Sequence, residues 1–178
     1  KILIANKQAL SSSFTFDNFS NYGNLTLLGR VNNDNNILKS KLFNTFATIN
    51  EFKKKVKKDF NIEINNNNTL AVGTAVFRNA NNGELAAQIL EKRTGIKVNI
   101  ISDEDEAKFS MVGAIESGSQ RTRKNEEIML IDQGGSSTEI SFASCSKKTE
   151  KIIFNYLQSL NIGTIELQKN IFNEKNFP

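Results

Sequence analysis

The most informative segment of the sequence reads Ile131-Asp132-Gln133-Gly134-Gly135-Ser136-Ser137-Thr138-Glu139. It joins an apolar strand, which begins at Ile128, to a second strand from Thr138 to Ala143 in which apolar and polar residues alternate. Two adjacent glycines place no Cβ atom at the turn, so consecutive backbone N–H groups could converge on a phosphate. Asp132, at the strand end, could hold a hydrated Mg²⁺ beside that anion. An ordinary Gly-Gly hairpin with an incidental aspartate explains the same pattern.

Upstream of this hairpin, short apolar strands alternate with helical patterns. Apolar residues from Leu38 to Val56 recur mostly every three or four positions, which predicts an amphipathic helix. The apolar runs Thr69 to Gly73 and Lys97 to Ile101 are typical of buried, parallel strands. Between them, a helix is predicted from Glu84 to Arg93, with Leu85, Ala86, Ile89 and Leu90 on one face. This order predicts an α/β sheet with right-handed crossovers.

A further helix is predicted after the second of these strands. Ser102 is its expected N-cap, and its first turn, Asp103-Glu104-Asp105-Glu106, is wholly acidic. Phe109, Val112 and Ile115 are expected to face the core. The helix dipole favours carboxylates at this end whatever the function, so a well-capped surface helix is one interpretation. In a cleft, one of these carboxylates could instead activate a water molecule.

The residue types that are missing restrict the chemistry. The chain has no histidine and a single cysteine, Cys145, which excludes Ser-His-Asp and Cys-His catalysis, zinc-finger sites and disulfide frameworks within it. A catalytic base must therefore be Asp, Glu, Lys or Tyr, and a metal must have oxygen ligands. Arg78, just beyond the first parallel strand, could grip a phosphate with its guanidinium, although an ordinary surface arginine fits the same position.

Charge and hydropathy place the chain among soluble proteins. Its 178 residues carry 23 Lys and Arg against 19 Asp and Glu, and no apolar run approaches the roughly 20 residues that cross a bilayer. With its lone cysteine, the chain is expected to be cytoplasmic. A run of five lysines is either a solvated helix face or a basic patch for a polyanion; aromatic interleaving is absent, which argues against specific nucleic-acid binding. These lysines are Lys53, Lys54, Lys55, Lys57 and Lys58.

Taken together, these motifs resemble the exopolyphosphatase and guanosine pentaphosphate phosphatase (Ppx/GppA) family. Three segments carry the resemblance in the family's order, and a fainter fourth follows them; the whole covers roughly Asn36 to Asn173. The segments are Ala71 to Asn81, Thr94 to Ala107, Ile131 to Glu139 and Ser159 to Thr164.

The resemblance implies an α/β fold of the actin, sugar kinase and heat-shock chaperone ATPase superfamily. Members have two ribonuclease H-like lobes around a phosphate-binding cleft. Residues 1–121 would form the first lobe, and residues 122–178 the beginning of the second with its phosphate loop. The implied activity is Mg²⁺-dependent hydrolysis of terminal phosphoanhydride bonds in inorganic polyphosphate or guanosine pentaphosphate, the latter tied to the bacterial stringent response. A homodimer is also consistent with the resemblance.

The resemblance also assigns roles to single residues. Glu106 matches the family's catalytic glutamate, which activates or orients water, and Arg78 matches a phosphate-gripping arginine. Asp132 and Glu139 match organisers of Mg²⁺ or water. The implied phosphate loop consists of Gly134, Gly135, Ser136, Ser137 and Thr138.

The sequence departs from the family pattern in three places. The family's first phosphate hairpin, which reads approximately Asp-Leu-Gly-Ser-Asn-Ser, has only a weak counterpart at Ala9 to Phe14. Gln133 replaces an aliphatic residue, and Ser136 replaces a third glycine, which a negative φ would tolerate. Two explanations stay open. Either the chain is part of a longer reading frame, or the first loop has decayed and the protein senses a phosphate or nucleotide without hydrolysing it.

Overall fold

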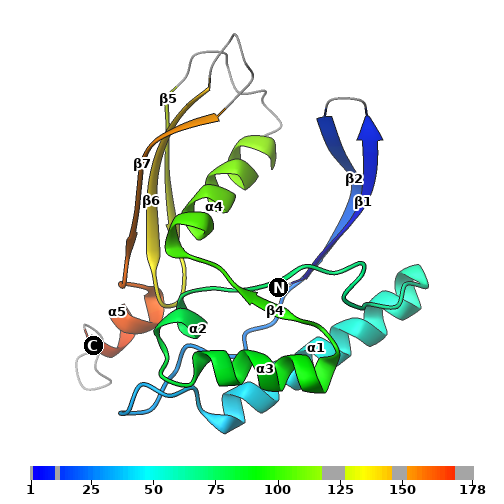
Figure 1. Cartoon of the computed structure of the whole chain (residues 1–178), viewed down its shortest axis with the longest axis vertical. Helices are drawn as coiled ribbons and strands as arrows, with labels where there is room; N and C mark the ends of the chain where they lie inside the picture. The colour runs from blue at the N-terminus through cyan, green and yellow to red at the C-terminus, as the bar shows by residue number, and fades with distance from the viewer. Residues whose placement is uncertain (1, 11–12, 118–126, 146–151, 171–178) are drawn as a thin grey trace, which may run out of the picture.

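The structure is a computed structural model that describes residues 2–10, 13–117, 127–145 and 152–170 (Figure 1). A helical unit with two small sheets lies at one end, and a three-stranded antiparallel sheet rises beside it. Helix α4 (Asp103–Ser117) stands between this sheet and an N-terminal hairpin. The predicted boundary at residue 121 falls outside the described residues, so the division into two lobes stays a prediction.

The first unit begins with strands that the sequence patterns did not predict. Strands β1 (Ile2–Leu10) and β2 (Ser13–Tyr22) form an antiparallel hairpin that projects from the helices (Figure 1). The predicted amphipathic helix is confirmed as α1 (Lys39–Phe60), which buries Phe52 and Val56. Since its apolar positions recur at helical spacing, the helix presents one continuous stripe to the core.

The strand–helix–strand prediction is confirmed. Strand β3 (Ala71–Gly73) runs parallel to β4 (Val98–Ile100), and the chain crosses between them through α2 (Ala75–Asn79) and α3 (Gly83–Thr94). The crossover helices pack so closely at Gly83 that a Cβ atom at this residue would lie 1.8 Å from the Phe77 carbonyl oxygen. The core of this unit contains Ile37, Phe77, Ala80, Ala86, Ala87 and Leu90.

The predicted face of α3 was partly wrong. Leu90 and Ala86 are buried as expected, but Leu85 and Ile89 are exposed. Ala87 is buried in their place, so the packed stripe is rotated toward small residues. The helix is capped at Gly95, which has the positive φ of 70° typical of a C-terminal glycine cap.

The inward face predicted for α4 was wrong at two of its three positions, and the third, Ile115, is half-buried. Phe109 is 61% exposed and Val112 is also exposed, whereas Ala107 and Met111 are buried almost completely. The helix packs against the three-stranded sheet through the row that contains Ala107 and Met111. The small side chain of Ala107 allows the backbone of α4 to approach the sheet closely. Helix α4 is apolar on more than one side, so its periodicity did not identify the buried row.

The second unit is an antiparallel meander, in which the two predicted strands are joined by a third. Strands β5 (Glu127–Gln133), β6 (Thr138–Cys145) and β7 (Ile152–Leu160) pair in that order, and α5 (Thr164–Asn170) follows. One face of the sheet contacts α4. The opposite face exposes a set of large apolar side chains: Met129, Ile131, Phe142, Ile153 and Tyr156.

None of the helices in the described part of the chain is long and apolar enough to cross a membrane.

Candidate active site

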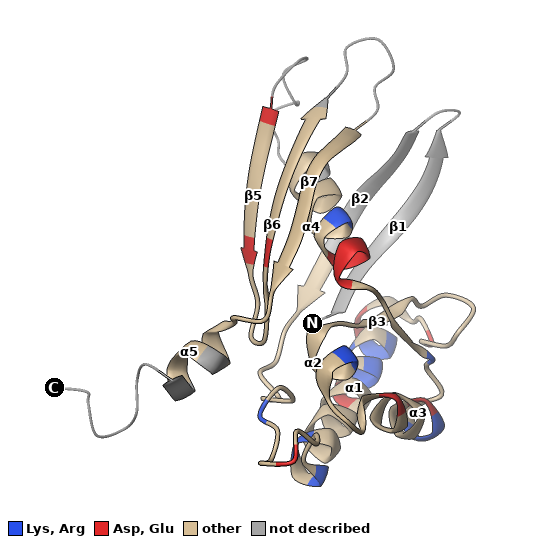
Figure 2. Ribbon diagram, turned by 60° about the vertical axis from the view of Figure 1, so that its left-hand side comes forward, with Lys and Arg blue, Asp and Glu red and all other residues tan. Residues whose placement is uncertain are grey.

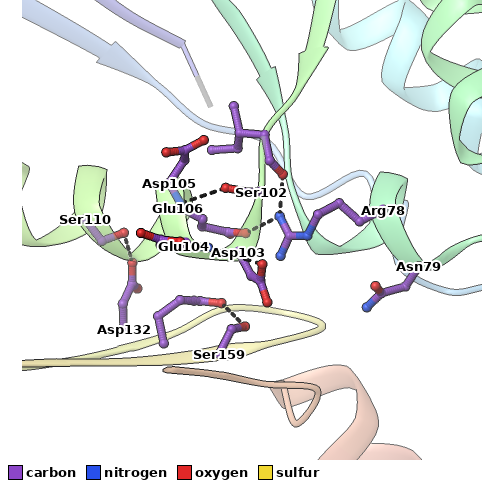
Figure 3. Close-up of polar contacts among 12 residues, drawn as sticks. Arg78, Asn79, Ser102, Asp103, Glu104, Asp105, Glu106, Ser110, Asp132 and Ser159 are labelled. Atoms are coloured by element: carbon purple, nitrogen blue, oxygen red, sulfur yellow. Dashed lines mark hydrogen bonds and ion pairs between the residues drawn. The ribbon is translucent and has the colours of Figure 1, made fainter. Parts of the chain in front are cut away.

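The centre of the candidate site is an ion pair between two elements of the chain. Arg78, in the last turn of α2, donates from Nη1 to Oε2 of Glu106 on α4 over 2.7 Å, and also to the Ile101 carbonyl over 3.0 Å (Figure 3). The two side chains are only 17% and 16% exposed. Partial burial strengthens such a pair because surrounding water screens it less. The structure therefore brings together the two first-unit residues that the sequence singled out.

The contacts of the acidic turn separate Glu106 from its neighbours. Ser102 caps the helix as predicted, because its Oγ accepts the Asp105 N–H over 3.0 Å. Glu104 accepts a hydrogen bond from the Lys108 ammonium, and this bond raises the pKa of Lys108. Glu106, paired with Arg78, is thus the carboxylate of this turn that combines partial burial with a guanidinium partner.

The loop of the second unit, residues 134–138, is anchored through its carbonyl groups. The carbonyls of Gly134 and Gly135 accept the N–H groups of Thr164 and Ile165, the first residues of α5, over 3.0 and 2.9 Å. Gly163 makes this contact possible, since a Cβ atom there would lie 2.3 Å from the Gly135 carbonyl. The loop therefore lies directly on the start of α5.

The same anchoring leaves backbone donors of the loop available. Within the described part of the chain, the N–H groups of Gly135, Ser136 and Ser137 have no hydrogen-bond acceptor. The φ angle of Ser136 is not positive, so a serine fits where the family pattern has a third glycine. Gln133 is exposed, so its amide does not disturb the packing of the sheet. Consecutive free N–H groups in a tight turn are the usual basis of anion binding.

The two predicted metal residues lie opposite each other but in different surroundings. Asp132 pairs with Glu139 across β5 and β6, so both side chains point to the same face of the sheet. Asp132 is exposed, and its Oδ2 accepts the Ser110 hydroxyl over 2.6 Å. Glu139 is only 2% exposed and accepts the Ser159 hydroxyl over 2.9 Å. Asp132 is thus the more accessible of the two carboxylates.

These residues fit Mg²⁺ as a partly solvated ion. Among the described side chains, no group of three or more Asp, Glu, Cys or His residues lies close enough to enclose a metal. Mg²⁺ commonly binds to only one or two carboxylates and keeps several waters, with the remaining ligands supplied by substrate phosphates. The exposed Asp132 beside a loop with free N–H groups meets that requirement.

Contacts between the two units place the loop close to the first unit. Asn79, next to Arg78, donates to the Asn161 side chain over 3.0 Å. Gly29 approaches Ser136 so closely that a Cβ atom at residue 29 would lie 2.7 Å from the serine Oγ. Figure 3 shows Arg78 and Asn79 beside the acidic turn of α4, with Asp132 and Ser159 on the adjacent strands.

Sequence reasoning missed several polar residues of this site. Ser110, Asn79, Asn161 and Ser159 all contact predicted site residues or join the two units. For Ser110 a signal existed, because it lies four positions after Glu106 and so occupies the same row of α4. For Asn79 and Asn161, which are 82 positions apart, no local pattern indicates the contact.

The lysine run lies in the second half of α1, a helix whose ribbon is coloured blue at its Lys positions in Figure 2. Lys55 pairs with Glu51, Lys57 pairs with Glu63, and Lys53 donates to the Thr94 carbonyl. These local partners favour the interpretation of the run as a solvated helix face.

Comparisons with known proteins agree with the geometry. The model of the Ppx/GppA phosphatase family matches residues 4–177. The bifunctional 3-dehydroquinate synthase/phosphatase of Fusobacterium nucleatum is 27% identical over 175 residues, which are 97% of this chain and 24% of that protein.

Solved structures show the same fold. The Ppx/GppA family member from Aquifex aeolicus has a TM-score of 0.63 at 24% identity, over 94% of this chain and 50% of that one. An exopolyphosphatase-like protein has a TM-score of 0.73 at 19% identity, over 94% and 49% of the two chains. An exopolyphosphatase from Cytophaga hutchinsonii has a TM-score of 0.68 at 18% identity, over 92% and 47%.

The chain thus spans about half the length of these solved structures. Their likeness confirms the predicted fold class, an α/β fold of the actin and sugar kinase type with ribonuclease H-like topology. The family match extends over almost every residue, including both elements of the Arg78–Glu106 pair and the loop at 134–138. This chain belongs to the Ppx/GppA phosphatase family.

Proposed function

We propose that the protein containing this chain hydrolyses terminal phosphoanhydride bonds of inorganic polyphosphate or guanosine pentaphosphate, with Mg²⁺ as cofactor. The observation that carries the proposal is the Arg78–Glu106 pair, which places a carboxylate and a guanidinium 2.7 Å apart. The phosphate loop supports it further, because Ser136 of this loop lies close to Gly29 of the first unit. Phosphoryl transfer requires mainly positioning and charge neutralisation, which these residues can supply without a histidine.

Glu106 is the proposed base. Without substrate, its carboxylate accepts a hydrogen bond from Arg78. A terminal phosphate that binds the same guanidinium competes with Glu106 for it, because the phosphate offers more negative charge and bidentate geometry. The carboxylate is then free to accept a proton from the attacking water. Substrate binding and activation of the base are coupled in this proposal through Arg78.

The second unit holds the phosphate chain. The free N–H groups of residues 135–137 would donate to phosphate oxygens, and the hydroxyl groups of Ser136 and Ser137 lie in the same loop. Asp132 would bind Mg²⁺, with Glu139 behind it as a buried organiser of the strand pair. When bound, Mg²⁺ neutralises developing negative charge on the phosphate oxygens.

Both proposed substrates present a terminal phosphoanhydride. Two of the solved relatives are an exopolyphosphatase and an exopolyphosphatase-like protein, and the Fusobacterium nucleatum relative is a bifunctional 3-dehydroquinate synthase/phosphatase. Inorganic polyphosphate is accordingly the first substrate to test, with guanosine pentaphosphate beside it.

The test is phosphate release by the intact protein, expressed from its full reading frame, with and without Mg²⁺. We expect release by the wild type and a loss of about 10²- to 10⁴-fold in Glu106→Gln, which removes a proton acceptor at nearly constant shape. Glu104→Gln is the matched control, because Glu104 lies on the same helical turn but pairs with Lys108. Normal turnover by Glu106→Gln would contradict the assignment of the base.

A folded intact protein that binds polyphosphate without releasing phosphate would instead support a sensor of the same fold. Binding of polyphosphate is measured by titration calorimetry at a Mg²⁺ concentration that does not saturate the protein. In that outcome, the hydrolase proposal fails while the phosphate-binding roles of Arg78 and of the loop at 134–138 stand.

A further inference from the structure

Ser110 connects the candidate base to the candidate metal ligand. It lies one helical turn after Glu106 on α4, so both side chains project from the same row of the helix. Glu106 reaches Arg78 in the first unit, and Ser110 reaches Asp132 on β5 in the second. One row of α4 thus contacts a residue of each unit (Figure 3).

The Ser110 contact has the geometry of a strong hydrogen bond. Its Oγ lies 2.6 Å from Asp132 Oδ2, within the range of a hydroxyl that donates to a carboxylate. The bond occupies Oδ2 only, and within the described part of the chain Oδ1 has no protein partner. A cation can therefore bind to Oδ1 while Ser110 holds the carboxylate plane in place.

Packing of α4 on the sheet does not account for this serine. Ala107 and Met111, which are 1% and 0% exposed, form the buried contact of the helix, whereas Ser110 is only half-buried. An alanine at this position would leave that buried contact intact. The hydroxyl is thus distinguished by its bond to Asp132.

We propose that Ser110 is a positioning residue, which orients the Asp132 carboxylate for a divalent cation and fixes its placement relative to Glu106. This inference rests on the proposed function only in that Asp132 is taken as the cation ligand. Hydrogen-bonded partners of metal ligands typically contribute 10- to 100-fold to metal affinity, because they hold the ligand in its binding orientation.

The test is a titration of the intact protein with Mn²⁺, a hard cation that suits carboxylate ligands and is visible in electron paramagnetic resonance. The signal of free Mn²⁺ reports binding without any turnover. We expect Ser110→Ala to weaken binding about tenfold, Ser110→Thr to retain wild-type affinity, and Asp132→Asn to remove the site. Equal affinity in Ser110→Ala and wild type would overturn the proposal, as would equal binding in Asp132→Asn and wild type.

The matched control is Ser144→Ala, which makes the same chemical change far from Asp132. Ser144 lies near the end of β6, and its hydroxyl contacts Asn155. It should bind Mn²⁺ like the wild type. Ser110→Cys preserves the shape with a poorer donor and replaces the alanine variant if that variant does not fold. Phosphate release is measured on the same samples. Absence of hydrolysis together with Ser110-dependent Mn²⁺ binding would contradict the proposed function and leave the role of Ser110 intact.

Discussion

Arg78 and Glu106 form a 2.7 Å ion pair although 28 positions separate them in the chain. Arg78 follows the first parallel strand through α2, and Glu106 lies in the first turn of the helix after the second. Because adjacent parallel strands end at the same edge of the sheet, the chain segments that follow them meet there. The pair is therefore a direct product of the parallel arrangement.

The coupling within this pair is measurable. Arg78→Gln and Glu106→Gln should each destabilise the protein, since each leaves a partly buried charge without its partner. We expect the double variant to lose less stability than the sum of the two, with a coupling free energy of about 1–3 kcal/mol. Denaturant unfolding of the four proteins measures it. Strict additivity would show that the pair contributes nothing to folding.

Gly163 should tolerate no side chain. In Gly163→Ala the new Cβ atom would lie 2.3 Å from the Gly135 carbonyl, so either the loop or the start of α5 must move. We expect a loss of about 1–3 kcal/mol in unfolding free energy and weaker polyphosphate binding, measured by thermal unfolding and calorimetry.

The control for this variant is Gly113→Ala, in the middle of α4, where a Cβ atom would meet nothing within 4 Å. It should stabilise the protein by about 0.5–1 kcal/mol, because alanine restricts the unfolded chain more than glycine does. If both variants destabilise the protein equally, the close packing of Gly163 on the loop is not the cause.

The cap at Ser102 should support the helix that bears Glu106. Ser102→Ala removes the acceptor of the Asp105 N–H group, and we expect a loss of about 1 kcal/mol in unfolding free energy. Ser102→Asp keeps an acceptor and should retain most of the stability. Thermal unfolding compares the three proteins, and a Ser102→Asp variant as unstable as Ser102→Ala would argue against a capping role.

The lysine run should contribute little to ligand binding. Lys54 and Lys58 are exposed, and the local ion pairs of Lys55 and Lys57 already offset part of the positive charge. We expect Lys54→Gln/Lys58→Gln to bind long-chain polyphosphate with unchanged affinity at low and high salt. A loss of affinity that is larger at low salt would instead support a basic patch that attracts the polyanion.

Local patterns predicted the elements well where one face of a segment is clearly apolar. Helix α1 follows from spacings of three and four, β5 from a continuous apolar run, and β6 from the alternation of apolar and polar residues. The pattern failed for α4, where Phe109 was expected inside and Met111 is buried instead. Since apolar side chains lie on several sides of α4, the sheet that packs against it selects the buried row.

The candidate residues themselves were also visible in the sequence, because chemistry restricts which side chains can act as a base or grip a phosphate. Arg78, Asp132 and the acidic turn at 103–106 follow from residue type, position and the absence of histidine, and the resemblance to the Ppx/GppA family singled out Glu106 within that turn. The long-range contacts of the site were not visible. Ser110 against Asp132 and Asn79 against Asn161 join segments far apart in the chain, and no spacing rule relates such segments.

The amino-acid sequence was thus sufficient for the order of the elements α1, β3, α3, β4, α4, β5 and β6, because hydrophobic periodicity and capping act over a few residues, but it did not indicate the hairpin β1–β2 or the short helix α2. It was sufficient for the family resemblance as well, because three motifs occur in one order. Only the tertiary structure decided which acid of the α4 turn meets Arg78 and which hydroxyl holds Asp132. Those contacts depend on how α4 lies between two separate sheets, and that placement results from the packing of the whole chain.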